Sequence, residues 1–121
     1  MACALPTRAA PVDEADDLES VVRRAQAYRR VVDGERIVRE FACARCHGAD
    51  YRGGVGPSLI DSVRSRSRAD FTRMLLDGNP QRGMPPYKSI AGVAQNTGLI
   101  YDYLRAEAMG STLPGDVPLR P

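Results

Sequence analysis

The chain has 121 residues, which is enough for one small domain and too few for a separate catalytic domain beside it. Its 17 basic and 15 acidic residues leave a formal charge of +2, which excludes the strongly basic surface of a nucleic-acid-binding protein. No apolar stretch is long enough to cross a bilayer, so no membrane span is predicted.

Residues 1–12 are predicted to be an extended lead-in, because Pro6 and Pro11 disfavour a regular element. The small residues at 2–4 match the A-x-A cleavage site of a secretory signal, with the mature chain beginning near Leu5. We therefore interpret the lead-in as the remnant of a removed export signal. A misassigned start codon explains the same three residues equally well. Cys3 is expected to have no role, and a lipid anchor and an intermolecular disulfide are the alternatives for it.

An N-terminal helix is predicted over residues 13–32, since apolar residues recur there at steps of three and four. Acidic residues at its start and arginines further along agree with the helix dipole. Asp33 is expected to cap a second helix, which carries Gly34 and Phe41 on one face and leads directly into Cys43. The apolar positions of the first helix are Leu18, Val21, Val22, Ala25, Tyr28 and Val32.

Glycines and a shortage of apolar residues predict a loop over 48–66, and a loop of that length in a small domain usually wraps around something. A helix is predicted for 68–77, with Met74 on its packed face and Gly78 at its end. The three prolines of residues 79–90 predict turns there.

The last helix is predicted from a cap at Asn96 or Thr97 to Ala108, and Gly110 is expected to end it. An extended tail is predicted for 111–121. The residues of this helix expected to face inward are Ile100, Tyr103, Leu104 and Ala108.

The strongest signal is the segment Cys43-Ala44-Arg45-Cys46-His47, which has the C-x-x-C-H spacing of covalent haem attachment. Two thiols three positions apart can reach neighbouring vinyl groups of one porphyrin, and the adjacent imidazole then lies beneath the iron. The sequence therefore predicts one haem c, attached through Cys43 and Cys46, with His47 as an axial iron ligand.

Two other interpretations of these cysteines are weaker. A zinc site needs further ligands, and the chain has only one more cysteine, Cys3, and no second histidine. A thioredoxin-type redox pair needs a strand-turn-helix setting, and no such pattern surrounds Cys43.

A six-coordinate electron carrier needs a second axial ligand, and because His47 is the sole histidine the available donors are methionines. Met84 lies between a glycine and two prolines, so a stiff backbone presents its sulfur at a fixed point. Met74 is expected to fill the core, and Met109 follows the last helix. We predict Met84 as the ligand; without it, a haem with an open sixth site for gas binding or sensing is the alternative.

His47 also needs an acceptor for its second ring nitrogen, and the carbonyl of Pro57 is the candidate. An ordinary loop proline is the alternative interpretation. Haem contacts are further expected of Tyr87, at the ring edge or a propionate, and of Arg64, at a propionate. Simple packing of the tyrosine and a solvated arginine explain the same two residues.

Over about residues 33 to 109 the chain resembles class I cytochromes c. The resemblance rests on the motif at 43–47, the segment Gly56-Pro57-Ser58-Leu59, the Met84 loop and the closing helix. It implies an all-α fold wrapped round one covalently bound haem, with a haem domain at 33–110 and an additional N-terminal helix. In that family the helix before the motif crosses the last helix, which implies a contact of Gly34 with Tyr101 or Tyr103.

A narrower likeness covers Tyr28 to Gly34, Gly83 to Tyr87 and Tyr101 to Arg105. These stretches are similar to periplasmic cytochromes that accept electrons from PQQ-dependent methanol or ethanol dehydrogenases. The likeness implies a monomeric periplasmic one-electron carrier rather than an enzyme, with a terminal oxidase or another cytochrome as acceptor. A cytochrome subunit of a larger dehydrogenase complex is a further alternative.

Overall fold

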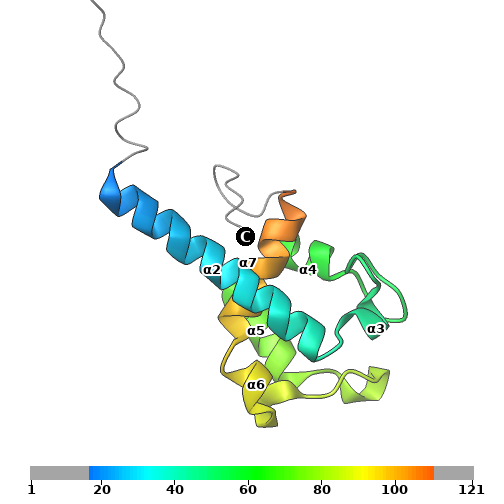
Figure 1. Ribbon diagram of the computed structural model, residues 1–121. Helices are drawn as coiled ribbons and strands as arrows, with labels where there is room; N and C mark the ends of the chain where they lie inside the picture. The colour runs from blue at the N-terminus through cyan, green and yellow to red at the C-terminus, as the bar shows by residue number, and fades with distance from the viewer. Residues whose placement is uncertain (1–16, 111–121) are drawn as a thin grey trace, which may run out of the picture.

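The computed structural model describes residues 17–110, and within that range it is built of helices without a β-strand (Figure 1). The predicted all-α class is confirmed. Expectations for residues 1–12, for 13–16 and for the tail at 111–121 lie outside the described residues. The elements are α2 (Leu18–Glu40), α3 (Ala44–His47), α4 (Leu59–Ser65), α5 (Arg68–Asp77), the 3-10 turns η1 (Pro80–Arg82) and η2 (Tyr87–Ser89), α6 (Ala91–Ala94) and α7 (Thr97–Ala108).

α2 is one continuous helix where two were predicted, so the boundary placed between residues 32 and 33 is wrong. Its N-cap is Asp17, whose side chain accepts a hydrogen bond from the backbone N–H of Glu19 at 3.2 Å. Asp33 lies inside the helix, with its carboxylate 3.7 Å from the guanidinium of Arg36. The helix continues through Gly34, whose lack of a side chain allows the close approach of α7. The expected additional helix is therefore the N-terminal part of α2.

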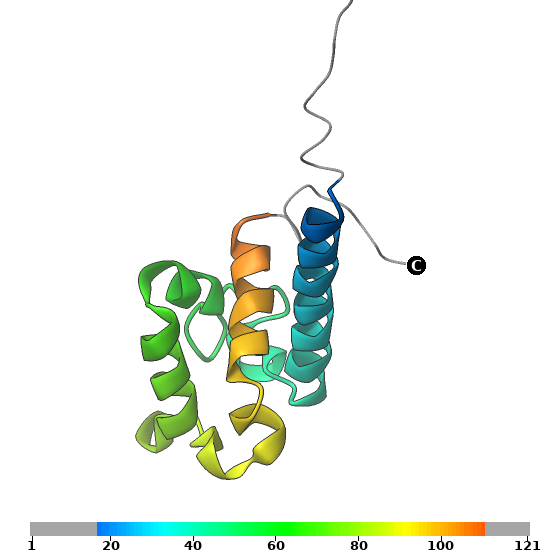
Figure 2. The ribbon, with the colours of Figure 1, turned by 90° about the vertical axis from the view of Figure 1, so that its left-hand side faces the viewer.

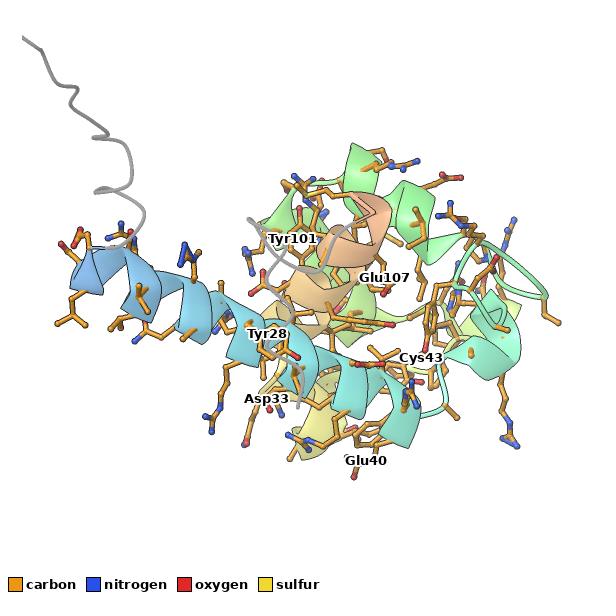
Figure 3. All side chains as sticks on the ribbon, turned by 45° about the horizontal axis from the view of Figure 1, so that its top comes forward. Tyr28, Asp33, Glu40, Cys43, Tyr101 and Glu107 are labelled. Atoms are coloured by element: carbon orange, nitrogen blue, oxygen red, sulfur yellow. The ribbon has the colours of Figure 1, made fainter. Side chains whose placement is uncertain are left out.

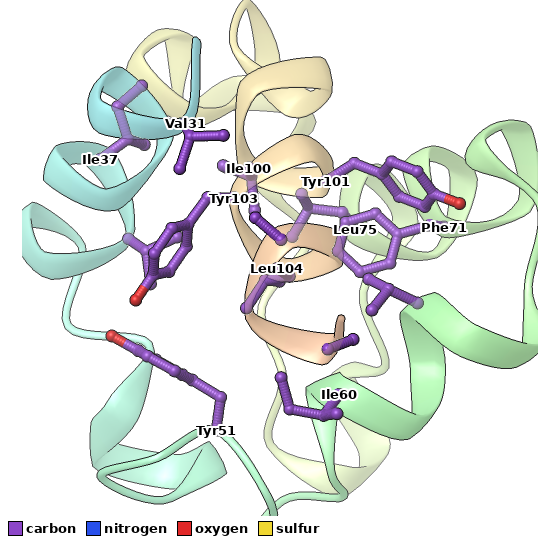
Figure 4. Packing of buried hydrophobic residues seen from close by; sticks show 14 of the residues in the cluster. Val31, Ile37, Tyr51, Ile60, Phe71, Leu75, Ile100, Tyr101, Tyr103 and Leu104 are labelled. Carbon is purple, nitrogen blue, oxygen red and sulfur yellow. The ribbon is translucent and has the colours of Figure 1, made fainter. Parts of the chain in front are cut away.

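α7 lies in the middle of the fold, and α2 packs beside it at one edge (Figure 2). The two helices are in close contact at Gly34, where a Cβ atom would overlap the carbonyl of Leu99 and lie 2.8 Å from the Cβ atom of Tyr103. Of the two tyrosines expected at this contact, Tyr103 is the one found there. Apolar side chains of both helices are buried around it (Figure 4): Val31, Ile37, Val38, Ile100, Tyr103 and Leu104.

α4 and α5 cover another face of α7. The bounds of α5 agree with the helix predicted at 68–77, and the ring of Phe71 meets that of Tyr101 edge to face at 5.4 Å between centroids. Leu75, one turn further along α5, is also buried. This side of the core is therefore closed by aromatic and aliphatic packing onto α7.

Two expectations for this region are wrong. α4 is a helix inside the segment predicted to be a loop, because Ser58 caps it by accepting a hydrogen bond from the backbone N–H of Asp61 at 3.1 Å, and Ile60 and Val63 are buried one turn apart. Met74 is 38% exposed instead of filling the core, since the packed face of α5 is formed by its neighbours.

One carboxylate joins three helices. Asp102 on α7 accepts hydrogen bonds from Arg30 of α2 at 2.6 Å and from Arg68 of α5 at 2.7 Å. The guanidinium of Arg68 also lies over the ring of Tyr101, 4.7 Å from its centroid. Both arginines are about half exposed, so each pair contributes roughly 0.2–1 kcal/mol to stability. The contact fixes the relative position of the helices more than it stabilises them.

Candidate functional site

The cysteine motif follows directly from the C-terminal end of α2. A single residue with positive φ, Ala42 at +54°, turns the chain, and the backbone N–H of Cys43 then donates to the carbonyl of Val38 at 3.2 Å. The motif forms the single turn α3, in which residues three and four positions apart share one face. Cys43, Cys46 and His47 therefore project from one short, anchored segment, and both thiols are free of a disulfide.

Burial raises the pKa of the Cys43 thiol, and the neighbouring Cys46 raises it further, while a backbone hydrogen bond lowers it. The thiol of Cys43 is therefore neutral at physiological pH. This environment does not favour the thiolate that a metal ligand or a redox-active pair requires.

The imidazole of His47 is fixed through one of its nitrogens. Its Nδ1 lies 2.8 Å from the carbonyl oxygen of Pro57, which can only accept, so Nδ1 carries the proton and donates. Gly56 lies against the ring, where a Cβ atom would be 2.9 Å from Cε1 of the imidazole. Nε2 is consequently the nitrogen left for a metal ion, on a ring whose orientation is set from behind.

The loop that carries Pro57 is held to the motif by main-chain hydrogen bonds. The N–H of Gly56 donates to the carbonyl of Cys46 at 2.6 Å, and that of Gly53 donates to the carbonyl of His47 at 2.8 Å. Gly48, at φ +95°, has no room for a Cβ atom, which would lie 2.5 Å from the carbonyl oxygen of Gly53. The glycines allow the loop to fold back onto the motif at backbone contact distance.

Tyr51 anchors this loop in the core. It is 8% exposed and has a positive φ of +63°, and its carbonyl accepts from the N–H of Leu59 at 2.8 Å. Its ring meets that of Tyr103 edge to face, with centroids 6.1 Å apart, and Figure 4 shows the two hydroxyl groups directed toward one another. Burial raises the pKa of both phenols.

Both the backbone N–H and the backbone carbonyl of Met84 are hydrogen-bonded. Its N–H donates to the carbonyl of Asn79 at 3.0 Å, and its carbonyl accepts from the N–H of Asn79 at 2.9 Å, which forms an isolated antiparallel bridge. Gly83 makes the turn in the left-handed region at φ +95°. At Gly78 a Cβ atom would overlap the carbonyl of Pro85, so the loop is folded tightly onto the end of α5.

The Met84 loop and the cysteine motif both contribute residues that pack against the core. Burial raises the pKa of Tyr87, and the thiols of Cys43 and Cys46 raise it further, so this phenol lies within electrostatic range of both. Cys43, Leu59, Met84 and Tyr87 are all half-buried against the same core. Residues of the cysteine motif and of the Met84 loop therefore pack on one and the same core.

Arg64 is the predicted site residue that the structure places elsewhere. Its guanidinium donates to the carbonyl of Ala108 at 2.8 Å, at the C-terminal end of α7, and Arg105 reciprocates by donating to the carbonyl of Val63 at 3.3 Å. Arg64 would have to leave this carbonyl to reach a propionate. The sequence analysis did not assign a role to Gly56 or to Asn79. The position of Gly56 beside Pro57 could have indicated its contact with His47. Asn79 acts through its backbone, so its residue type gives no indication of its role.

The donor set fits a covalently attached haem. Two free thiols lie one helical turn apart, one imidazole has a single nitrogen held by a carbonyl, and a thioether sits on a fixed backbone. By contrast, residues 17–110 contain no group of three or more His, Cys, Asp or Glu side chains that could hold a metal ion. This finding argues against the zinc interpretation within the described part of the chain.

Comparison with known proteins also points to a cytochrome. A family model described as "Cytochrome C oxidase, cbb3-type, subunit III" matches residues 29–104. Cytochrome c-555 of Methylococcus capsulatus is 27% identical over 117 residues, which cover 96% of this chain and 81% of that protein. Cytochrome c55X of Pseudomonas aeruginosa is 37% identical over 49 residues, which cover 40% of this chain and 41% of that protein. No solved structure matches significantly.

Proposed function

We propose which residues of this chain bind the haem and which proteins exchange electrons with it. The chain belongs to the cytochrome c family described as cytochrome c oxidase, cbb3-type, subunit III. It is a monohaem cytochrome c of class I with one covalent haem c, and it carries electrons rather than acting as an enzyme. When bound, the haem iron supplies the one-electron chemistry.

Cys43 and Cys46 would form the thioether bonds to the haem, and His47, through Nε2, and Met84, through its sulfur, would bind the iron. The observation that carries this assignment is the 2.8 Å hydrogen bond from His47 Nδ1 to the carbonyl of Pro57, because it orients the ring and leaves Nε2 available. The paired hydrogen bonds between Met84 and Asn79 support the second ligand. Tyr87, which faces the thiols, is proposed to cover the haem edge.

Fixed ligands suit electron transfer. The His47 imidazole is held by its hydrogen bond to Pro57, and the backbone of Met84 is held by its hydrogen bonds to Asn79, so both ligands would move little between the two oxidation states of the iron. The reorganisation energy of electron transfer would therefore be small. Ligation by methionine would also raise the reduction potential. This arrangement offers no acid-base pair and requires no substrate pocket. The alternative with an open sixth site requires that Met84 not bind the iron.

Met84→Ala tests the second ligand. The variant should keep its covalent haem but lose the methionine-to-iron charge-transfer band of the oxidised protein, and it should bind CO when reduced. Met74→Ala is the matched control, since Met74 lies 38% exposed on α5 and should leave the band unchanged. Tight CO binding by the unaltered protein would overturn the assignment.

We propose that the chain works in the periplasm, between a PQQ-dependent methanol or ethanol dehydrogenase as donor and a terminal oxidase or another cytochrome as acceptor. The support is the sequence likeness at Tyr28 to Gly34, Gly83 to Tyr87 and Tyr101 to Arg105. An alcohol oxidation releases two electrons, and a single haem accepts them one at a time.

Reduction kinetics test the donor. The oxidised holoprotein should be reduced by a purified methanol or ethanol dehydrogenase with its alcohol, and measurements at two ionic strengths would detect charge steering of the encounter. Absence of reduction by both dehydrogenases would refute the donor class and leave the haem ligands untouched.

A further inference from the structure

The N-terminal half of α2 extends beyond the helices that pack against its C-terminal half (Figures 1 and 3). Buried residues of α2 begin only at Val31, while Leu18 is 74% exposed, Val21 41% and Val22 43%. An isolated helix of about three turns is marginal in water. This half of α2 is therefore longer and more apolar on its surface than the core of the molecule explains.

The exposed apolar side chains share one face of the helix. Steps of four and three residues connect Leu18, Val22, Ala25, Arg29 and Val32, so they line up along α2. We call the apolar members of this row, with the adjacent Val21, the outer stripe. The outer stripe thus consists of five exposed residues: Leu18, Val21, Val22, Ala25 and Val32.

The outer stripe faces away from the core. The residues that α2 buries are Val31, Gly34, Ile37 and Val38, which project from the opposite side of the helix at 100° per residue. A shallow groove runs along the exposed side, lined by Val22, Ala25, Gln26, Arg29 and Arg30. Single exposed apolar residues are ordinary, but an aligned row on a projecting helix marks an interaction surface.

Charge along the stripe is divided between its ends. Asp17 is the N-cap of α2, and Glu19 lies in its first turn. Arg29 lies three turns further along, and within residues 17–110 it has no ion-pair partner. If the same helix from a second copy packed against this one in the antiparallel direction, the acidic end of each helix would lie beside the basic end of the other.

We propose that the outer stripe pairs, antiparallel, with the outer stripe of a second copy of this chain. About a two-fold axis near the middle of Leu18 to Arg29, Val22 of each copy lies against Ala25 of the other, and each contact occurs twice. Glu19 of each copy then lies near Arg29 of the other, and the helix dipoles oppose. The small Ala25 side chain allows close approach of the two helices.

Such a pairing buries one face of one helix, so a weak dimer is expected rather than an obligate one. It departs from the monomer expected from the sequence and does not depend on the proposed ligands or electron donor. The opposite charges of Glu19 and Arg29 make the pairing salt-dependent, with weaker association at high ionic strength.

Sedimentation equilibrium of the holoprotein from low micromolar to millimolar concentration tests the proposal. The expected result is a reversible monomer–dimer equilibrium whose dissociation constant rises at least tenfold in Val22→Glu. The matched control is Val55→Glu, because Val55 is a 90% exposed valine in the loop after the motif and should leave the equilibrium unchanged. The haem absorption spectrum and the helical circular dichroism confirm that each variant is folded.

A charge exchange tests the orientation. Glu19→Arg and Arg29→Glu should each raise the dissociation constant about threefold or more, and the double variant should return it toward the original value. The loss of the exposed Glu19–Arg23 pair within the helix contributes little to these changes. A monomer at every concentration, equal effects of Val22→Glu and Val55→Glu, or a double variant weaker than either single variant would overturn the proposal.

Discussion

His47 and Met84 are the two proposed iron ligands, and the molecule supports them in different ways. The side chain of His47 is held at its own atoms, by the carbonyl of Pro57 at Nδ1 and by Gly56 against the ring. Met84 is held through its backbone, by the paired hydrogen bonds with Asn79, and its half-buried side chain packs against the core. The His47 ring is thus oriented by a hydrogen bond to its own side chain, whereas the Met84 side chain is positioned by its backbone and by apolar packing.

The two supports also differ in how they reach the core. Tyr51 carries the His47 side inward, since its buried ring lies against Tyr103 of α7. The Met84 side rests on the end of α5 at Gly78. The His47 side is therefore part of the folding core, and the Met84 side is a loop attached to it. Substitutions that affect one side and spare the other can test this difference.

Tyr51→Ala should have the largest effect. Removing a buried aromatic side chain costs about 3–5 kcal/mol of the free energy of unfolding, and this loss falls on the His47 side. Denaturant unfolding of the holoprotein measures it. Tyr28→Ala is the control, because Tyr28 is only half-buried on α2. Equal losses from both variants would mean that Tyr51 is not an anchor.

Gly78→Ala should act on the Met84 side. At φ +65°, with its new Cβ atom overlapping the carbonyl of Pro85, the variant should lose about 1–3 kcal/mol of stability and weaken the methionine-to-iron band. Gly83→Ala has a comparable backbone, at φ +95°, but no atom lies within 4 Å of its Cβ position. The difference between the two variants isolates the steric contact; a band unchanged in both would contradict the proposed role of this loop.

Alkaline pH should weaken the His47 side through its buried phenols. The folded-state pKa of Tyr103 is raised by burial, so its contribution to stability is complete below about pH 10, the ordinary tyrosine value, and is lost as the pH rises further. Unfolding free energies between pH 8 and 11.5 should therefore fall at the alkaline end. Tyr103→Phe should reduce that fall, and an identical fall in the variant would refute the assignment.

Pro57→Ala should have the smallest effect. The carbonyl that accepts from His47 belongs to the backbone and survives the substitution, so the hydrogen bond is retained. The expected loss is about 0.4–1 kcal/mol, from the greater freedom of the unfolded chain. Thermal unfolding measures this loss, and the absorption spectrum should not change. A large spectral change would show that the proline ring itself orients His47.

Local signals predicted much of this molecule. The bounds of α5 and α7 follow mainly from the spacing of apolar residues. Ser67 and Asn96 occupy the N-cap positions, and of the two only the Ser67 side chain accepts a capping hydrogen bond. The cysteine motif identified its cofactor because attachment chemistry fixes the spacing of its three residues. Met84 was selected by the stiffness of its neighbours, and the bridge to Asn79 supplies a rigidity of the same kind.

Features that depend on distant contacts were not predictable in this way. Asp33 and Gly34 have the residue types of a helix boundary, but the helix continues through both of them, and Leu99 and Tyr103 of α7 lie against Gly34. Arg64 has the chemistry of a propionate ligand, but the end of α7 offers it a carbonyl instead. In both cases the residue type suggested one structural role, and contacts with distant parts of the chain gave the residue another.

The contact between α2 and α7 has a topological consequence. Arg30 and Asp102 are 72 positions apart, and their ion pair, together with the approach at Gly34, closes a loop that contains all the proposed haem ligands. Closing a loop of this length costs only slightly more entropy than closing a shorter one, since each doubling adds about 0.6 kcal/mol. The ligand-bearing segment, His47 and Met84 included, therefore has no free end from which fraying can begin.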